Sequence, residues 1–65
     1  MLIAMEVNKG QSVSLQFKCD YEKQTFRFVV VCRMKGKYTN DEYRSFKEAC
    51  EEFKRISAQI KEGNK

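Results

Sequence analysis

Residues 12–35 read SVSLQFKCDYEKQTFRFVVVCRMK, and this stretch contains two runs in which apolar and polar side chains alternate. The apolar positions are Val13, Leu15, Phe17, Cys19 and Tyr21 in the first run, and Phe26, Phe28, Val30, Cys32 and Met34 in the second. Alternation with a period of two is typical of a strand with one buried face. The stretch therefore predicts a hairpin of two antiparallel strands, each with one apolar and one polar face.

The turn of this hairpin is expected at Lys23 and Gln24. With that turn, each apolar residue of one strand meets an apolar residue of the other: Tyr21 with Phe26, Cys19 with Phe28, Phe17 with Val30, Leu15 with Cys32 and Val13 with Met34. A slip by one residue would move one apolar set to the opposite face, so the face of each side chain is strongly specified. On the polar face, this register predicts a cross-strand charge pair between Asp20 and Arg27.

A helix is predicted for residues 46–61. Its apolar face is formed by residues at helical spacing, namely Phe46, Ala49, Cys50, Phe53, Ile56, Ser57 and Ile60. Ser45 and Glu48 fit a capping box, in which each side chain accepts a hydrogen bond from the other residue's backbone N–H. Glu51 and Arg55 are four residues apart, in the order that favours an ion pair.

Two shorter segments flank the hairpin. Residues 2–7 alternate in polarity and form either a first strand or an arm that packs over the sheet. The apolar start of this segment is too short for a signal-peptide core or a membrane span. After residue 35, the chain either turns at Gly36 or bulges there and continues to a turn at Asn40 and Asp41.

Together these elements predict a single small domain over residues 1–65. Its fold class is α+β, with an antiparallel meander of three or four strands packed on one C-terminal helix in two layers. The strands are expected at about residues 2–7, 12–22, 25–35 and 42–45. Four phenylalanines are expected to dominate the core between the layers: Phe17, Phe28, Phe46 and Phe53.

The chain carries 13 Lys and Arg against 9 Asp and Glu, a formal net charge of +4. This surplus favours an anionic partner such as nucleic acid, although lysines that serve solubility alone explain it equally well. The three cysteines, Cys19, Cys32 and Cys50, are each expected on a core-facing side as free thiols. Reduced thiols in a core predict a cytosolic (cytoplasmic) protein.

The residues required for catalysis do not form a recognisable set. The chain has no histidine, no serine or cysteine beside an obvious activating group, and no glycine-rich phosphate loop. Without histidine, a metal site would need an unusual set of thiolates and carboxylates. We therefore expect no catalytic residue, no metal and no cofactor, and we predict that the protein is not an enzyme.

The sheet face opposite the helix is the predicted binding surface. The candidate residues for nucleic-acid binding on it are Gln16, Lys18, Arg27, Arg33 and Lys35. Lysine and arginine can contact phosphates and guanine edges, and glutamine can contact adenine, when a sheet enters the major groove. The leading prediction is therefore a small cytosolic protein that binds nucleic acid, with duplex DNA as the expected form.

The same face also carries two apolar residues, Val29 and Val31. A solvated sheet face is normally polar, so these valines favour an alternative in which the face is a protein interface. In that alternative the protein is a phage-type inhibitor, an antitoxin or a homodimer. The strand preference of valine, or cover by residues 2–7, also accounts for them.

The segment YRSFKEA at residues 43–49, which follows sheet strands and opens an amphipathic helix, resembles the AP2-like, arm-type DNA-binding domains of phage and transposon integrases. The likeness spans about residues 13–60 and lies mostly in the order of elements. One departure is that Ser45 precedes the aromatic Phe46, where the family usually has a capping threonine or serine after it. The resemblance implies a three-stranded sheet that lays its free face in the major groove. It would place on the DNA-facing side Gln16, Lys18, Arg27, Arg33 and Lys35.

Overall fold

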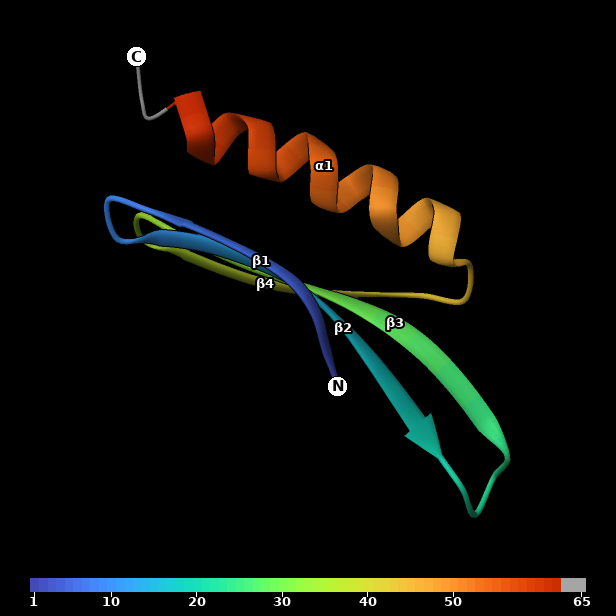
Figure 1. Ribbon diagram of the computed structural model, residues 1–65. Coiled ribbons are helices and arrows are strands. Elements are labelled where there is room, and N and C mark those ends of the chain that lie inside the picture. Colours follow the sequence, from blue (N-terminus) through green and yellow to red (C-terminus); the bar gives the residue numbers. More distant parts are fainter. Residues whose placement is uncertain (63–65) are drawn as a thin grey trace.

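A computed structural model describes residues 1–62 as an antiparallel sheet with one helix packed along one of its faces (Figure 1). The elements are β1 (Leu2–Asn8), β2 (Gln11–Asp20), β3 (Thr25–Met34), β4 (Lys37–Tyr43) and α1 (Phe46–Glu62). The strand order in the sheet is β1-β2-β3-β4, so each strand pairs with its neighbours in sequence. This confirms the predicted α+β meander of two layers.

The first turn shows that residues 2–7 belong to the sheet and do not form a covering arm. Asn8 lies opposite Gln11, and the two residues between them, Lys9 and Gly10, have φ angles of 53° and 80°. Two consecutive positive φ angles are those of a type I′ turn, whose twist suits a tight hairpin. β1 then pairs with β2 along its length, with one bulge between Leu2 and Ala4.

The β2–β3 hairpin has the predicted faces but a different register. Phe17 lies opposite Phe28, whereas the predicted register placed it opposite Val30. The two strands are therefore shifted by two residues relative to the prediction. Because side chains alternate with a period of two, this shift leaves every residue on its predicted face.

A four-residue loop, residues 21–24, replaces the predicted two-residue turn at Lys23 and Gln24. Asp20 starts this loop, because its Oδ1 accepts hydrogen bonds from the backbone N–H groups of Glu22 at 3.1 Å and Lys23 at 3.2 Å. An aspartate that bonds the backbone two and three residues ahead forms a local turn of its own. Gln24 closes the loop with a φ of 54°.

The last strand begins earlier than predicted. Met34 lies opposite Lys37, and Gly36 between them has a φ of 74°, so the chain turns at Lys35 and Gly36. A positive φ costs glycine little, which makes this the favoured of the two predicted turn positions. As a result, β4 covers residues 37–43, where a strand over 42–45 had been expected.

The helix begins and ends close to its predicted bounds. Ser45 caps it, since its Oγ accepts a hydrogen bond from the Glu48 backbone N–H at 3.4 Å and its C=O accepts one from the Ala49 N–H at 3.1 Å. The ion pair predicted between Glu51 and Arg55 is wrong, because Arg55 binds the carboxylate of Glu52.

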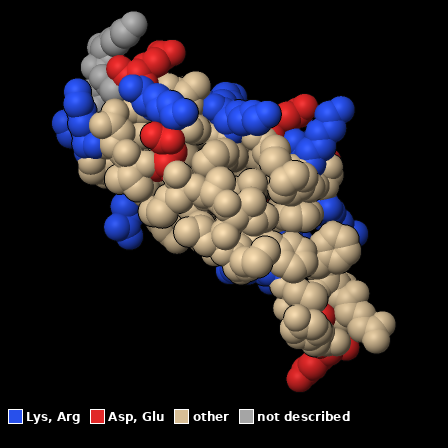
Figure 2. All heavy atoms as spheres, viewed as in Figure 1, with Lys and Arg blue, Asp and Glu red and all other residues tan. Residues whose placement is uncertain are grey.

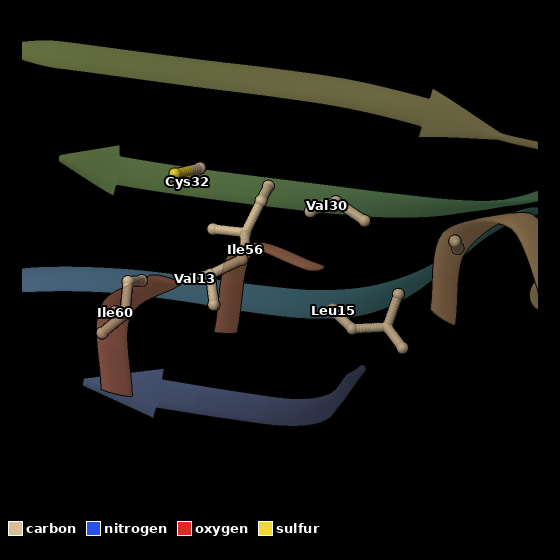
Figure 3. Close-up of a cluster of buried hydrophobic side chains, with 7 residues drawn as sticks. Val13, Leu15, Val30, Cys32, Ile56 and Ile60 are labelled. Atoms are coloured by element: carbon tan, nitrogen blue, oxygen red, sulfur yellow. The ribbon is translucent and has the colours of Figure 1, made fainter. Parts of the chain in front are cut away.

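The core is aliphatic. A cluster of fully or almost fully buried side chains joins β2, β3 and α1: Val13, Leu15, Val30, Cys32, Ala49, Ile56 and Ile60 (Figure 3). The prediction that four phenylalanines dominate the core is wrong. Phe28 and Phe53 are partly buried at its margin, and Phe46 is 49% exposed.

The course of the hairpin explains this difference. The ends of β2 and β3 that flank the loop at residues 21–24 bend away from α1 (Figure 1). Phe26 in this region is 58% exposed, whereas Phe28 contacts Phe46 in the first turn of the helix. These rings contact one another, with centroids 5.4 Å apart for Phe17 and Phe28 and 5.2 Å apart for Phe28 and Phe46. Cys19 lies in the same region and is exposed, whereas Cys32 is buried and Cys50 partly buried. The expectation of a buried Cys19 is therefore wrong.

Candidate functional site

The surface without a helix is the face of the sheet opposite α1, which we call the outer face. Strand register assigns to it Leu2, Met5 and Val7 of β1; Ser12, Ser14, Gln16, Lys18 and Asp20 of β2; Thr25, Arg27, Val29, Val31 and Arg33 of β3; and Tyr38, Asn40 and Glu42 of β4. Alternation along each strand places these side chains on the side away from the core. The outer face therefore draws on all four strands.

Four of the five residues predicted to bind nucleic acid share this face: Gln16, Lys18, Arg27 and Arg33. Lys35 is not on a strand, because it lies in the turn between β3 and β4. The sheet thus brings most of the predicted set together, with one member at the end of the sheet.

The charges of this set are partly engaged within the chain. Arg27 Nε lies 3.5 Å from Glu42 Oε1, so the ion pair predicted between Arg27 and Asp20 is wrong. The Arg33 guanidinium carbon lies 5.9 Å from the centre of the Tyr38 ring, a cation–π contact. Among residues 1–62, no acidic side chain forms an ion pair with Lys18.

The two valines of the outer face differ in exposure. Val29 is 0% exposed, although no helix covers it, and its neighbours across the sheet are Gln16 and Glu42. The Nε2 of Gln16 donates a hydrogen bond to Ser14 Oγ at 3.2 Å. Val31 is partly buried. Val29 therefore offers no surface to a partner, and Val31 offers only part of its side chain.

The exposed aliphatic side chains of the outer face lie instead along β1. Leu2, Met5 and Val7, which we call the β1 strip, are 56%, 53% and 59% exposed on the outer face. Figure 2 shows charged side chains along the helix and near the hairpin tip, and an uncharged area through the middle of the molecule, where β1 crosses the same view in Figure 1. The alternation of residues 2–7 was visible in the sequence, but its position at an uncovered edge was not.

The β2–β3 hairpin extends beyond both of its neighbours as a two-stranded arm. On one side the last pair is Met1 with Phe17, which exchange backbone hydrogen bonds of 2.7 and 2.8 Å. On the other side the last pair is Tyr43 with Phe28. Open hollows flank the arm on both sides, and Phe26 contributes to each of them while being 58% exposed.

Titratable groups with shifted pKa values lie on the helix side of the sheet. Burial raises the pKa of Tyr43, and the nearby Glu52 and Asp41 carboxylates raise it further. A hydrogen bond from Arg55 lowers the pKa of Glu52. Within residues 1–62, no three His, Cys, Asp or Glu side chains gather closely enough to hold a metal ion. The described part of the chain also contains no helix that is long and apolar enough to span a membrane.

Comparison of the chain with protein-family models, with curated proteins and with solved structures finds no match.

Proposed function

We propose that this chain is a small binding protein without catalytic activity, and that the outer face of its sheet binds another protein. The observation that carries the proposal is the β1 strip, in which Leu2, Met5 and Val7 are each more than half exposed on a face that no helix covers. Contiguous exposed apolar side chains with polar residues around them are typical of protein interfaces.

The charges of the outer face support a protein partner over a nucleic acid. Nucleic-acid affinity depends on several cations that are free to replace counterions along the phosphates. Here Glu42 offsets Arg27, and Asp20 also lies on the face. On this face, Lys18 and Arg33 form no ion pair with an acidic side chain of residues 1–62.

Binding of duplex DNA or another nucleic acid is a second candidate, because one observation favours it. Lys18 lies directly opposite Arg27 on the outer face. Like charges at directly opposed positions are unfavourable, and an anion between them would remove that cost. In this candidate Lys18, Arg27 and Arg33 contact phosphates, Lys35 extends the contact at the turn, and Gln16 reaches a base edge.

A cytosolic location is part of the proposal. The three cysteines are free, with Cys32 in the core. Unpaired thiols at these positions are compatible with a reducing compartment.

Capture of partners by a tagged chain tests the proposal. The double variant Met5→Lys with Val7→Lys places two charges in the β1 strip and should lose the partner protein. The matched control, Ala58→Lys with Gln59→Lys, adds the same charge at exposed positions of α1 and should retain it. Binding equal in the two variants, or a wild type that binds neither another protein nor a second copy of this chain, would contradict the proposal.

A salt titration against mixed-sequence duplex DNA tests the second candidate. Neutralising about four phosphates should give a slope of log K against log salt of about −3.6. Arg27→Ala with Arg33→Ala should flatten this slope by about 1.8. A complete lack of binding at low salt would eliminate the nucleic-acid candidate.

A further inference from the structure

We infer that the free edge of β1 pairs with the β1 edge of a second copy of this chain, which would join two four-stranded sheets into one continuous antiparallel sheet. The inference rests on the proposed function, since it names the protein that meets the β1 strip. Three properties of β1 carry it: the direction of its backbone groups, the lack of charge on its outer face, and the match of the strand to a copy of itself.

The backbone N–H and C=O groups of successive β1 residues point alternately to β2 and to the open edge. In a two-residue hairpin, the residues that flank the loop form a hydrogen-bonded pair, and such pairs recur at every second residue. Asn8 and Gln11 flank the Lys9–Gly10 loop, so Asn8 and Glu6 bond to β2. The N–H and C=O groups of Met5 and Val7 therefore point to the open edge.

The side chains of the same residues are apolar and exposed. Met5 and Val7 are 53% and 59% exposed. The one charged residue of β1, Glu6, points to the helix side, where its Oε1 lies 3.9 Å from Lys61 Nζ. A long edge strand with unpaired backbone groups and no charge on its outer face is a template for another strand.

The opposite edge of the sheet is protected. β4 carries three charged side chains, Lys37, Asp41 and Glu42, within seven residues. Charged residues on an edge strand are a common protection against pairing with other chains. The β4 edge therefore carries charges that oppose pairing with another strand, whereas the outer face of the β1 edge carries none.

A second copy fits this edge because antiparallel β1 strands are complementary to each other. A two-fold axis through Met5 places it opposite the partner's Met5, and places Ala4 opposite the partner's Glu6. An axis at Glu6 would place two carboxylates opposite each other, which is unfavourable. Such a two-fold pairing closes at the dimer.

The size of the edge predicts a weak dimer. A standard interface buries about 800 Å² on each partner, about one sixth of the 5038 Å² surface of this chain. One seven-residue edge buries less than this, so we expect a dissociation constant of roughly 1 to 100 μM. Since each copy carries a net charge of +4, salt should strengthen the association by screening repulsion, the opposite of its effect on nucleic-acid binding.

Sedimentation velocity combined with amide hydrogen exchange tests the pairing in the full chain. The sedimentation coefficient should rise with concentration across the micromolar range. Exchange of the Met5 and Val7 amides should slow by about tenfold or more when most of the protein is dimeric, because these N–H groups become bonded. The Glu6 amide, already bonded to β2, should change much less.

A charge-swap experiment tests the register. Met5→Lys alone and Met5→Glu alone should each be monomeric, because like charges meet at the axis, and an equal mixture should form a heterodimer. Asn40→Lys on the outer face of β4 is the matched control and should dimerise as the wild type does. Circular dichroism of each variant checks that the fold is kept.

The possible results separate this inference from the proposed function. A wild type that stays monomeric at about 1 mM, or a charge-swap mixture that stays monomeric, would overturn the β1 dimer. If the wild type is monomeric but captures another protein through the β1 strip, the proposed function stands and the dimer does not. If Met5→Lys with Val7→Lys neither weakens dimerisation nor loses a captured protein, both the β1 dimer and the proposed function are wrong.

Discussion

Arg27 on β3 and Glu42 on β4 form an ion pair across the outer face, with Arg27 Nε 3.5 Å from Glu42 Oε1. About half of each side chain is exposed, at 49% and 57%. Water and salt therefore screen the pair, and exposed pairs of this kind contribute about 0–1 kcal/mol. Its larger consequence is electrostatic, because it offsets one cation in the centre of the candidate binding surface.

Glu42→Gln should therefore change the free energy of unfolding by less than about 1 kcal/mol in a urea titration. If the protein binds DNA, the same variant should bind it more tightly at low salt, because it removes a negative charge beside Arg27, which contacts a phosphate in that candidate. Asp41→Asn is the matched control, since Asp41 lies opposite Val30 on the helix side and does not pair with Arg27. A loss of several kcal/mol in Glu42→Gln would show that the pair is not a screened surface contact.

Ile60→Ala should destabilise the protein by about 2–5 kcal/mol, because Ile60 is 0% exposed and its removal leaves a cavity between α1 and the sheet. Phe26→Ala removes a larger side chain but should cost only about 1 kcal/mol, since Phe26 is 58% exposed and its ring centroid lies 5.9 Å from that of Phe17 and 6.1 Å from that of Phe28. Urea unfolding of both variants measures the comparison. An equal or larger loss in Phe26→Ala would contradict the aliphatic core.

The faces of the hairpin could be predicted from the sequence, but its register could not. The face on which a side chain lies depends only on whether its position along the strand is odd or even, and the alternation of apolar and polar residues shows this directly. Both registers pair apolar residues with apolar residues: Leu15 meets Val30 in the structure and would meet Cys32 in the predicted register. The structure has the four-residue loop, in which Asp20 Oδ1 accepts two backbone hydrogen bonds, and the length of this loop sets the register.

The composition of the core depends on where the helix lies, which the sequence pattern does not state. Phe17 and Leu15 belong to the same apolar set of β2, yet Leu15 is 2% exposed and Phe17 is only partly buried. The helix covers the end of the sheet near the Lys9–Gly10 turn, where Asn8 and Ile60 are in contact. The aromatic residues lie toward the other end, where Phe46, the first residue of α1, contacts Phe28, and where Phe26 is 58% exposed.

The candidate site was predicted in part. The outer face contains four of the predicted residues, Gln16, Lys18, Arg27 and Arg33. Their alternating positions along β2 and β3 are enough to place them on this face. The ion pair between Arg27 and Glu42 could not be predicted, because the sequence allowed a turn either at Gly36 or at Asn40 and Asp41. These two turns align β4 differently with β3. The resemblance to integrase DNA-binding domains and the binding of DNA both remain predictions.

The stability of the protein should fall at acidic pH partly through Glu52. Arg55 Nε donates a hydrogen bond to Glu52 Oε1 at 3.0 Å, which lowers the pKa of this carboxyl below its ordinary value. A carboxylate with a lowered pKa stabilises the fold above its unfolded-state pKa, and this contribution is lost as the pH falls through its folded-state pKa.

Glu52→Gln should accordingly be less stable than the wild type at about pH 7, and the difference should disappear at about pH 2. Urea titrations at both pH values measure it. Glu51→Gln is the matched control, because Glu51 forms no ion pair with Arg55. A Glu52→Gln deficit that is the same at both pH values would contradict the assignment.

Asn8 joins the β1–β2 turn to the last turn of α1, because its Nδ2 donates a hydrogen bond of 2.9 Å to the C=O of Ile60. Carbonyl groups in the last turn of a helix have no partner within the helix, so this bond satisfies one of them. Asn8→Ala should cost about 0.5–1.5 kcal/mol and speed amide exchange in the last turn of α1.

Asn8→Asp should cost more than Asn8→Ala, since a carboxylate cannot donate this bond and its charge opposes the negative end of the helix dipole. The matched control is Asn40→Ala on β4, which is exposed and should be nearly neutral. Urea unfolding and hydrogen exchange measure both effects. If Asn8→Asp is as stable as the wild type, Asn8 does not hold the helix end.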